Sequence, residues 1–341
     1  MTRRRLVQAV ALLALGLLIL YGLFRSVHPA EVARAISHAT PGWMLLGALC
    51  YAAFLLVRSW RWQIILEASA PAARLHDVAA VTGIGFAVNS VSPFKLGELV
   101  RIAAIAPRAR IGVGEAGATV VLERVLDVLA LVVLALGAAA ISGSASRGAG
   151  LWTGVIIFAI VCAGIAMLAF LMVSRPAATL RLCALFSSRL PSRLRTRADD
   201  LAGSVIKGFT ALRSPGRLAA TGLLSLLTWA LIVAGLILFF RAVSPQLSLA
   251  TLFLACTIFV VSQAVSITPG SVGTYEGFFL LVLSTFGAKP AALVTAAAVL
   301  SHALNIGVLL LGGALGAVWL RLHPAGLPVR SQSPGLGEHG P

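Results

Sequence analysis

Long apolar runs, separated by short polar or basic stretches, dominate the chain. Uninterrupted runs cover about residues 6–24, 41–66, 117–141, 151–173, 218–240 and 291–320. Each comes near the roughly 20 apolar residues with which an α-helix crosses about 30 Å of hydrocarbon. Transmembrane β-barrels show short alternating segments instead. The pattern therefore predicts an all-α polytopic membrane protein with about six full transmembrane helices.

Two further apolar stretches are each broken in the middle by polar, helix-breaking residues. The first covers about 75–105 and is interrupted by NSVSP; the second covers about 249–286 and is interrupted by TPGSVGTYEG. The first is too short for two complete crossings, which need roughly 40 residues. We therefore predict two broken, re-entrant helical hairpins. The first opens towards the cytoplasm and the second outwards, so the halves 41–173 and 217–320 would be inverted repeats.

The remaining segments complete a single transmembrane domain over residues 1–321. The linker 174–217 is strongly basic, and the positive-inside rule places it and both termini in the cytoplasm. A cleaved signal peptide is the competing interpretation of the first run, but the run is long for one and no clear cleavage site follows. Residues 28–40 are expected to form a short amphipathic surface helix, and the Pro- and Gly-rich tail 322–341 to be disordered.

Composition and charge agree with a membrane protein. Hydrophobic residues make up 59% of the chain and charged residues 11%, against about 25% charged residues in a soluble domain. The net charge of +16 has no soluble basic domain to carry it, so we expect attraction to anionic lipid headgroups and no nucleic-acid partner. The four cysteines form no CxxC pair and the six histidines no HExxH spacing, so neither a metal nor a cofactor is expected.

The two breaks share a phrase: SVSPFKLGE at residues 90–98 and SITPGSVGTYE at residues 266–276. Ser92 and Thr268 are suited to act as N-caps, with Pro93 and Pro269 at the first helical position, where a missing N–H is harmless. Each break would then start a half-helix whose free N–H groups and positive dipole end face a cavity. This arrangement predicts an anion-binding site in the membrane.

Neighbouring residues strengthen this hypothesis. Lys95 and Arg101 would add full positive charges to the first break. Gly97, Gly270 and Gly273 would let a ligand or a neighbouring helix approach the backbone closely.

Ionisable residues also occur within the apolar run TVVLERVLDVLALVVL. Glu123 and Asp127 share one helix face at i,i+4 spacing, and Arg124 reaches Asp127 at i,i+3. Intramembrane charges usually pair, so an ion pair that only holds helices together is the alternative to a binding role. Glu98 and Glu276 could pair with Lys95, Arg101 or Arg124, or could carry protons.

In the second half, His302 and Asn305 come after the second phrase, in the way that Glu123 and Asp127 come after the first phrase. A packed, hydrogen-bonded histidine is the alternative there. Arg58 and Arg61 lie in VRSWRWQ, which is either an ordinary aromatic and basic anchor at the interface or a headgroup-binding element.

Taken together, these motifs resemble the membrane domain of lysylphosphatidylglycerol synthase/flippase proteins and their stand-alone relatives. The matching features are Arg-x-x-Arg-Trp at 58–62, Asn89-x3-Pro93-x3-Gly97-Glu98-x2-Arg101, Glu123-Arg124-x2-Asp127 and Pro269-Gly270-x2-Gly273-x2-Glu276. One departure is Ser271, where relatives often have a second glycine. The resemblance implies a protein of the bacterial cytoplasmic membrane that moves a lipid headgroup between leaflets. Two-domain relatives carry a cytosolic aminoacyl-transferase domain, for which no room follows residue 320, so we do not expect that enzyme activity here.

The sequence thus leads to one principal hypothesis, a flippase for an anionic, aminoacylated or lipid-linked headgroup whose lipid is a phospholipid or a polyprenyl-linked lipid. A membrane-embedded lipid-modifying transferase and a non-catalytic scaffold of an envelope-synthesis complex remain open, as does a homodimer or a partner enzyme. The predicted substrate-binding residues are Arg58, Arg61, Asn89, Ser92, Pro93, Lys95, Gly97, Glu98, Arg101, Glu123, Arg124, Asp127, Thr268, Pro269, Gly270, Gly273, Glu276, His302 and Asn305.

Overall fold

The described part of the chain is entirely helical. The structure is a computed structural model, and it describes residues 3–71, 73–92, 96–142, 214–243, 247–263 and 268–324, with isolated positions between 164 and 203. Its elements are α1 (Arg3–Ser26), α2 (Pro29–Ser37), α3 (Pro41–Glu67), α4 (Leu75–Val91), α5 (Gly97–Ala109), α6 (Val113–Ser142), α10 (Pro215–Val243), α11 (Leu249–Ser262), the 3₁₀ helix η5 (Pro269–Ser271), α12 (Thr274–Thr285) and α13 (Ala291–Leu322).

Among the described residues, α3, α6, α10 and α13 are long and apolar enough to cross a membrane. The same described residues include three shorter apolar helical segments: the part Leu12–Leu23 of α1, the helix α4 and the helix α11. Four of the six predicted spans therefore appear at full length, and the first appears as α1 with a shorter apolar part. The predicted span 151–173 lies outside the described residues, as do most of the linker 174–217 and the tail from residue 325 on.

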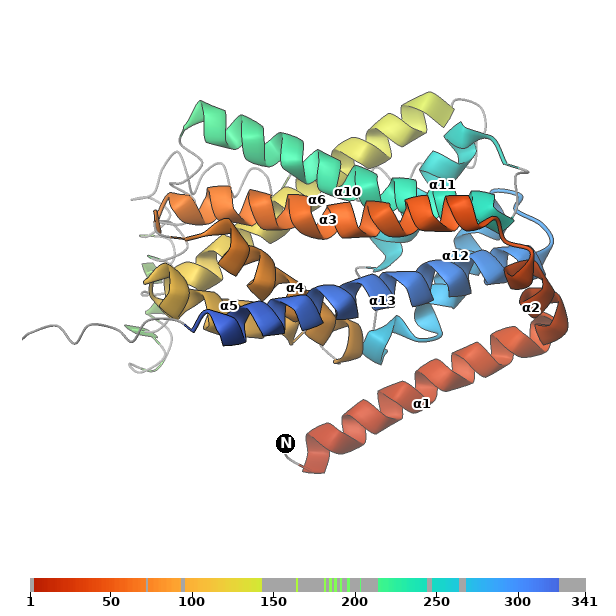
Figure 1. Cartoon of the computed structure of the whole chain (residues 1–341), viewed down its shortest axis with the longest axis horizontal. Coiled ribbons are helices and arrows are strands. Elements are labelled where there is room, and N and C mark those ends of the chain that lie inside the picture. The colour runs from red at the N-terminus through yellow and green to blue at the C-terminus, as the bar shows by residue number, and fades with distance from the viewer. Residues whose placement is uncertain are drawn as a thin grey trace, which may run out of the picture.

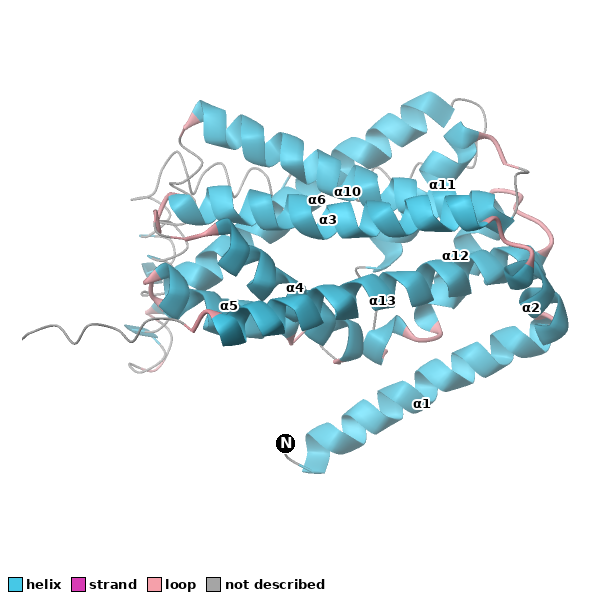
Figure 2. Cartoon of the chain, viewed as in Figure 1, coloured by secondary structure: helices cyan, strands magenta, loops and turns pink. Residues whose placement is uncertain are grey.

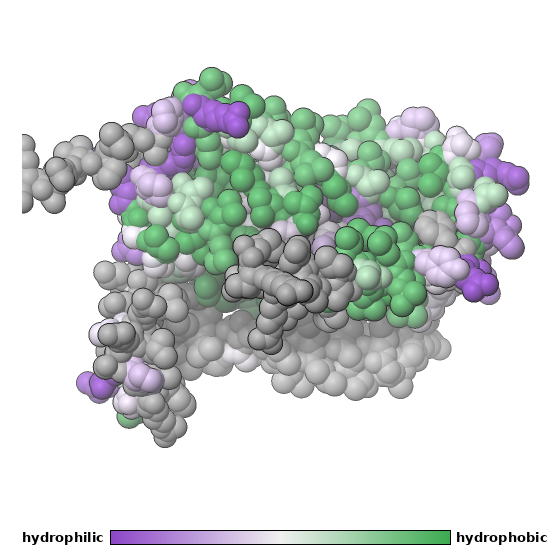
Figure 3. Space-filling model, turned by 90° about the horizontal axis from the view of Figure 1, so that it is seen from below, coloured by the Kyte–Doolittle hydropathy of each residue, from purple (hydrophilic) through white to green (hydrophobic). Residues whose placement is uncertain are grey.

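The four long helices lie side by side along the long axis, in two directions (Figure 1). In that view α3 and α13 run from right to left, whereas α6 and α10 run from left to right. α3 packs along α10, and α13 packs along α4. The surface in Figure 3 is mostly hydrophobic along the middle and hydrophilic at the two ends of the molecule, as a membrane-crossing bundle requires.

The two broken stretches enter the bundle from opposite ends. α4 and α5 come in from the left of Figure 1 and return to it, and α11 and α12 do the same from the right. The inner ends of these helices lie near the middle of the bundle (Figure 2). The prediction of helices broken within the apolar stretches 75–105 and 249–286 is thereby confirmed.

Two packed regions hold these hairpins. Around the first break, Trp62 of α3 is buried with apolar residues of α4, α5 and α6. Around the second, Phe259 of α11 packs edge-on against Tyr275 and Phe279 of α12, with ring centroids 4.8 and 5.0 Å away. α2, the predicted surface helix, buries Val32 against Ala292 and Ala296 of α13. Each break is therefore held between packed helices of its own half.

The predicted N-caps are wrong in detail. Ser92 does not start a helix: it follows the last residue of α4, and α5 begins five residues later, at Gly97. Asn89 takes over the capping role, because its Oδ1 accepts the Gly97 N–H at 2.8 Å. Pro93 and Lys95 lie outside the described residues.

The second break is built differently. Thr268 does precede Pro269 at the first position of η5, but its hydroxyl donates to the Val272 carbonyl at 2.9 Å instead of capping. The chain then turns through three residues with positive φ, Gly270 at 61°, Ser271 at 58° and Gly273 at 78°. Glycine adopts such angles more readily than other residues, so Gly270 and Gly273 help η5 to end and α12 to begin within a few residues.

Candidate functional site: an ionic cluster and a His–Glu pair beside two helix breaks

Seven ionisable side chains from three helices meet inside the bundle. We call this group the ionic cluster: Arg58 and Arg61 of α3, Glu98 and Arg101 of α5, and Glu123, Arg124 and Asp127 of α6. All were predicted as site residues from the sequence, and the structure brings them together. Four guanidinium groups face three carboxylates, so the cluster carries one more positive than negative charge.

Asp127 lies at the centre of one part of the cluster. Its Oδ2 accepts from Arg58 Nη2 at 2.7 Å, and its Oδ1 accepts from Arg61 Nη1 at 2.8 Å. The predicted ion pair with Arg124 is also present, at 3.3 Å. The indole N–H of Trp229 in α10 donates to Oδ1 at 3.1 Å. The carboxylate is thus held by groups from three helices.

Glu123 holds the other part together. Its side chain is completely buried, and its two oxygens accept from Arg101 Nη2 at 2.6 Å and from Arg61 Nη2 at 3.1 Å. The Arg101 guanidinium also lies 3.9 Å from the ring centroid of Trp62, a cation–π contact. Removing charges from water is costly and is offset only where pairing is nearly complete, as it is here.

Glu98 forms the accessible edge of the cluster. It bridges two guanidinium groups, accepting from Arg124 Nη2 at 2.7 Å and from Arg101 Nη1 at 3.0 Å. The Glu98 side chain is 21% exposed and that of Arg124 is 44% exposed, whereas those of Arg58, Arg61 and Arg101 are at most 1% exposed. A ligand can therefore reach the cluster at Glu98 and Arg124.

Some donors of the cluster remain unused. The Nε atoms of Arg58, Arg61 and Arg101 are buried without a hydrogen-bond partner in the described structure. Native proteins leave few buried polar groups unsatisfied. Together with the excess of positive charge, these donors favour an anion as the missing partner.

The second break carries a smaller group, which we call the His–Glu pair: Glu276 of α12 and His302 of α13. His302 Nδ1 lies 2.6 Å from Glu276 Oε1, and His302 Nε2 lies 2.9 Å from the Gly270 carbonyl oxygen. The other carboxylate oxygen accepts the Gly273 N–H at 2.8 Å. The imidazole also stacks on the Tyr275 ring, with centroids 4.2 Å apart. The predicted pairing of Glu276 with Arg101 or Arg124 is thus wrong, because its ion-pair partner among the described residues is His302. Lys95 lies outside the described residues.

The two breaks touch each other. A Cβ placed on Gly270 would lie 2.8 Å from the carbonyl oxygen of Ser90. Ser90 lies in the last turn of α4, which ends at Val91. α1 closes the same place from the other side, because a Cβ on Gly16 would lie 2.6 Å from the Val272 carbonyl oxygen. The described parts of the two breaks therefore lie close together, whereas Pro93 and Lys95 lie outside the described residues. Asn305 lies on α13 three residues beyond His302 and is half-buried.

The sequence interpretation missed two contributors. Trp229 binds Asp127, and Ser225 Oγ accepts from Arg61 Nη1 at 2.8 Å. Trp62, which was singled out in the Arg-x-x-Arg-Trp motif, covers Arg101 with its ring. Ser225 and Trp229 lie four residues apart on α10, so they share one face. A polar residue and a hydrogen-bonding aromatic at this spacing in an apolar run are a signal that could have been used.

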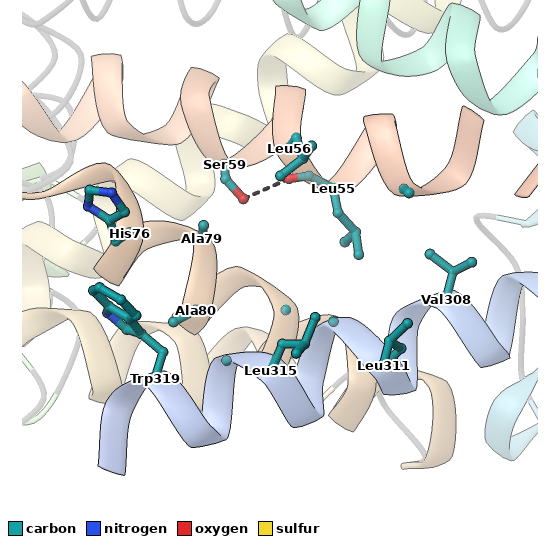
Figure 4. A pocket seen from close by; sticks show the side chains of 14 residues that line it. Leu55, Leu56, Ser59, His76, Ala79, Ala80, Val308, Leu311, Leu315 and Trp319 are labelled. Carbon is teal, nitrogen blue, oxygen red and sulfur yellow. Dashed lines mark hydrogen bonds between the residues drawn. The ribbon is translucent and has the colours of Figure 1, made fainter. Parts of the chain in front are cut away.

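A pocket of 420 Å³ lies between α3, α4 and α13, beside the ionic cluster's helix α3 (Figure 4). Leu55 and Leu56 of α3 face Leu311 and Leu315 of α13 across it. Its lining is apolar apart from a few groups, among them Ser59, which directly follows Arg58, and His76 and Trp319 at one end. An apolar pocket with a polar end has a lining that suits a hydrocarbon chain.

Comparison with known proteins now adds a family. The family model described as the lysylphosphatidylglycerol synthase TM region matches residues 8–313, which is most of the chain. The chain belongs to this family. With its long apolar helices, family membership makes it a multi-pass membrane protein, and it confirms the resemblance stated from the motifs.

One curated relative is "Glycosyltransferase AglD" of Haloferax volcanii. It is 27% identical over an alignment of 333 positions that covers 89% of this chain and 52% of the relative. The chain therefore spans about half the length of the relative it matches.

Proposed function

We propose that this protein moves the headgroup of an anionic or aminoacylated lipid, or of a lipid-linked precursor, between the leaflets of its membrane. The ionic cluster carries the proposal. It lies on α5 and on α3 and α6, which are long and apolar enough to cross a membrane, has an excess of guanidinium groups and is accessible at Glu98 and Arg124. Ionisable residues inside a membrane are costly, and they typically mark a substrate or ion pathway.

Glu98 supports the choice of an anionic ligand. Its carboxylate bridges Arg101 and Arg124 in the way that a phosphate oxygen pair would. Arginine binds carboxylate and phosphate with the same planar fork of donors. A headgroup phosphate would replace Glu98 at these two guanidinium groups, while the buried pairs at Glu123 and Asp127 would hold the arginines in place.

The arrangement of helices supports alternating access. In Figure 1, α3 of the first half runs opposite to α10 of the second, α6 runs opposite to α13, and the two broken hairpins enter from opposite ends. These directions support a pair of inverted-topology repeats, in which one repeat moves against the other around a central site. The breaks near the middle of the bundle would be re-entrant loops, whose free backbone groups are satisfied by protein or by the ligand.

The apolar pocket beside α3 would hold part of the lipid's hydrocarbon chain. Its leucine-rich lining suits an acyl or polyprenyl chain, and its wall includes Ser59, next to Arg58 of the cluster. The headgroup and the chain would then bind to opposite sides of the same helix. Glycines let its walls approach closely, since a Cβ on Gly83 would lie 2.5 Å from the Gly312 carbonyl oxygen.

A translocation assay tests the proposal. The full chain is reconstituted into phosphatidylcholine vesicles with a trace of fluorescent phosphatidylglycerol, and a membrane-impermeant reductant reports the probe in the outer leaflet. Arg124→Gln removes an exposed donor together with its contacts to Glu98 and Asp127, and it leaves the buried pairs of Arg58, Arg61 and Arg101 intact. One charge-assisted hydrogen bond is worth about 1.5–3 kcal/mol, so we expect translocation at least about tenfold slower.

The control for this assay is Arg108→Gln. Arg108 forms an ion pair with Asp77 at 3.2 Å outside the ionic cluster, so its loss removes one positive charge without touching the site. Equal rates for the wild type and Arg124→Gln, with Arg108→Gln also unchanged, would rule out the cluster as the headgroup site.

The name of the relative favours a second candidate, a membrane-embedded lipid-modifying transferase. The two functions differ in their need for leaflets. A transferase converts a labelled lipid in detergent solution, whereas a flippase produces no chemical change there. Mass spectrometry of the lipid after incubation with candidate donors would show a new species only for the transferase.

A further inference from the structure

The hydrogen bonds of the His–Glu pair fix a proton. The Gly270 carbonyl can only accept, so His302 Nε2 must carry a hydrogen. His302 Nδ1 lies 2.6 Å from Glu276 Oε1, a distance at which a second hydrogen must lie between the two atoms, because two lone pairs would repel. The pair therefore holds one proton whether it is written as imidazolium with carboxylate or as imidazole with carboxylic acid.

Among the described residues around the pair, His302 and Glu276 are the groups that bind this proton. From α12 and α13, Tyr275 and Ser301 face the pair and hydrogen-bond to each other at 3.0 Å. Cys256 of α11 is buried nearby in the same apolar region. The sequence has no Lys or Arg between residues 242 and 288. From α1 and α4, the close neighbours of the break are the backbone groups of Gly16 and Ser90. Within the described residues, His302 is the ion-pair partner of Glu276.

The first break makes the contrast clear. There the corresponding carboxylate, Glu98, is held by Arg101 and Arg124. Arginine stays charged at any accessible pH, whereas imidazole is the side chain that ordinarily gains and loses its proton near neutrality. The second break is thus the one whose carboxylate has a partner able to release a proton.

The same two side chains also hold the backbone of the break. His302 binds the Gly270 carbonyl and Glu276 binds the Gly273 N–H. Losing the shared proton would leave a lone pair facing a carboxylate and one uncompensated negative charge in an apolar site, which is strongly unfavourable. The pair would separate, and Gly270 and Gly273 would lose two of the bonds that fix them against α4 and α1.

From this geometry we propose that the His–Glu pair is the proton-binding site of the protein, and that proton release and uptake there open and close the second break during lipid movement. The inference rests on the proposed function and supplies its energy source. The step involves no covalent change. One proton enters from one side of the membrane, lies between Nδ1 and Oε1, and leaves to the other side.

The first test measures the proton directly. Full-length protein labelled with ¹⁵N-histidine is placed in phosphatidylcholine nanodiscs and studied by NMR at increasing pH. We expect one strongly deshielded proton resonance, absent from both His302→Gln and Glu276→Gln, that disappears reversibly as the pH rises. His38→Gln is the matched control, since His38 is exposed at the end of α2, and it should retain the resonance. A wild-type spectrum without this resonance, or its survival in Glu276→Gln, would overturn the proposal.

The second test measures coupling. Movement of fluorescent phosphatidylglycerol in phosphatidylcholine vesicles is compared with and without an imposed pH gradient. The wild type and His38→Gln should respond severalfold to the gradient, whereas the ratio of the two rates should fall to one for His302→Gln. A response retained by His302→Gln contradicts proton coupling through this pair. If the wild type moves no lipid at all, the proposed function fails, and the NMR result still decides whether the proton site exists.

Discussion

The two helix breaks share a sequence phrase but differ in how each holds its carboxylate. Glu98, beside the first break, bridges two arginines at a partly exposed edge. Glu276, at the second, is buried, caps α12 through the Gly273 N–H and binds one imidazole. The first break also recruits its cap from a different helix, through Asn89. Similar local sequences thus produce a fixed charge in one half and a protonatable pair in the other.

This difference follows from what each half contributes to its break. The first half supplies Arg58 and Arg61 from α3 and Arg124 from α6, so each carboxylate of the ionic cluster is paired with guanidinium groups. In the second half, the stretch 242–288, which includes α11 and α12, has no Lys or Arg. Binding an anion and carrying a proton are opposite electrostatic tasks, and our two proposals assign them to different halves of the protein.

The largest effect is expected where the first half loses its central carboxylate. Asp127→Ala leaves Arg58 and Arg61 buried without their main partner. Removing one member of a buried ion pair costs about 3–5 kcal/mol. Unfolding of the purified protein in mixed micelles should therefore be shifted strongly towards lower denaturant. Asp77→Ala is the control, because its pair with Arg108 is partly exposed and is expected to be worth about 1 kcal/mol or less. Equal destabilisation by the two variants would contradict a buried, structurally required cluster.

A smaller effect is expected when the glycines at the breaks are enlarged. Gly97→Ala would drive a methyl group into the Gly85 carbonyl and the Asn89 side chain, and Gly270→Ala would meet the Ser90 carbonyl at a positive φ. Strain of this kind costs about 1–3 kcal/mol. The same unfolding measurement should show both variants destabilised. Gly137→Ala has no neighbour within 4 Å and should be neutral or slightly stabilising. If Gly137→Ala is the most harmful of the three, the close approach at the breaks is not what these glycines provide.

The smallest effect concerns the caps. Asn89→Ala removes the acceptor of the Gly97 N–H at the start of α5, which should cost about 1 kcal/mol. Asn89→Asp keeps an acceptor at the same position and should retain most of the stability. Hydrogen exchange of the α5 amides, followed by mass spectrometry, would show faster exchange in the alanine variant alone. Faster exchange in both variants would mean that the amide group of Asn89, and not its oxygen, is what matters.

Much of the fold could be predicted from the pattern of apolar residues. The run predicted over 41–66 is α3 (Pro41–Glu67), and the run over 117–141 is α6 (Val113–Ser142). The interruptions in the two broken stretches also appear where the polar phrases predicted them. These features depend on local sequence, namely on length, hydropathy and the helix-breaking residues.

The sequence predicted which residues form the ionic cluster better than it predicted which of them bind each other. The Arg124–Asp127 contact follows from i,i+3 spacing and is confirmed, as is the pairing of Glu98 with Arg101 and Arg124. The bonds from Arg58 and Arg61 to α6 join residues more than 60 positions apart, which no periodicity specifies. The N-caps failed for a similar reason, because a side chain from the preceding helix was better placed than the neighbouring Ser92.

The contact between Gly16 and the second break makes α1 a reporter of movement at that break. A Cβ on Gly16 would collide with the Val272 carbonyl, and one on Gly273 with the backbone of Gly16, so the two backbones lie almost in contact. Any rearrangement of that turn must displace α1 as well. Paired spin labels on exposed sites of α1 and α6, such as Leu18 and Leu136, would then report the turnover cycle as a change in distance, without any label placed in the binding region itself.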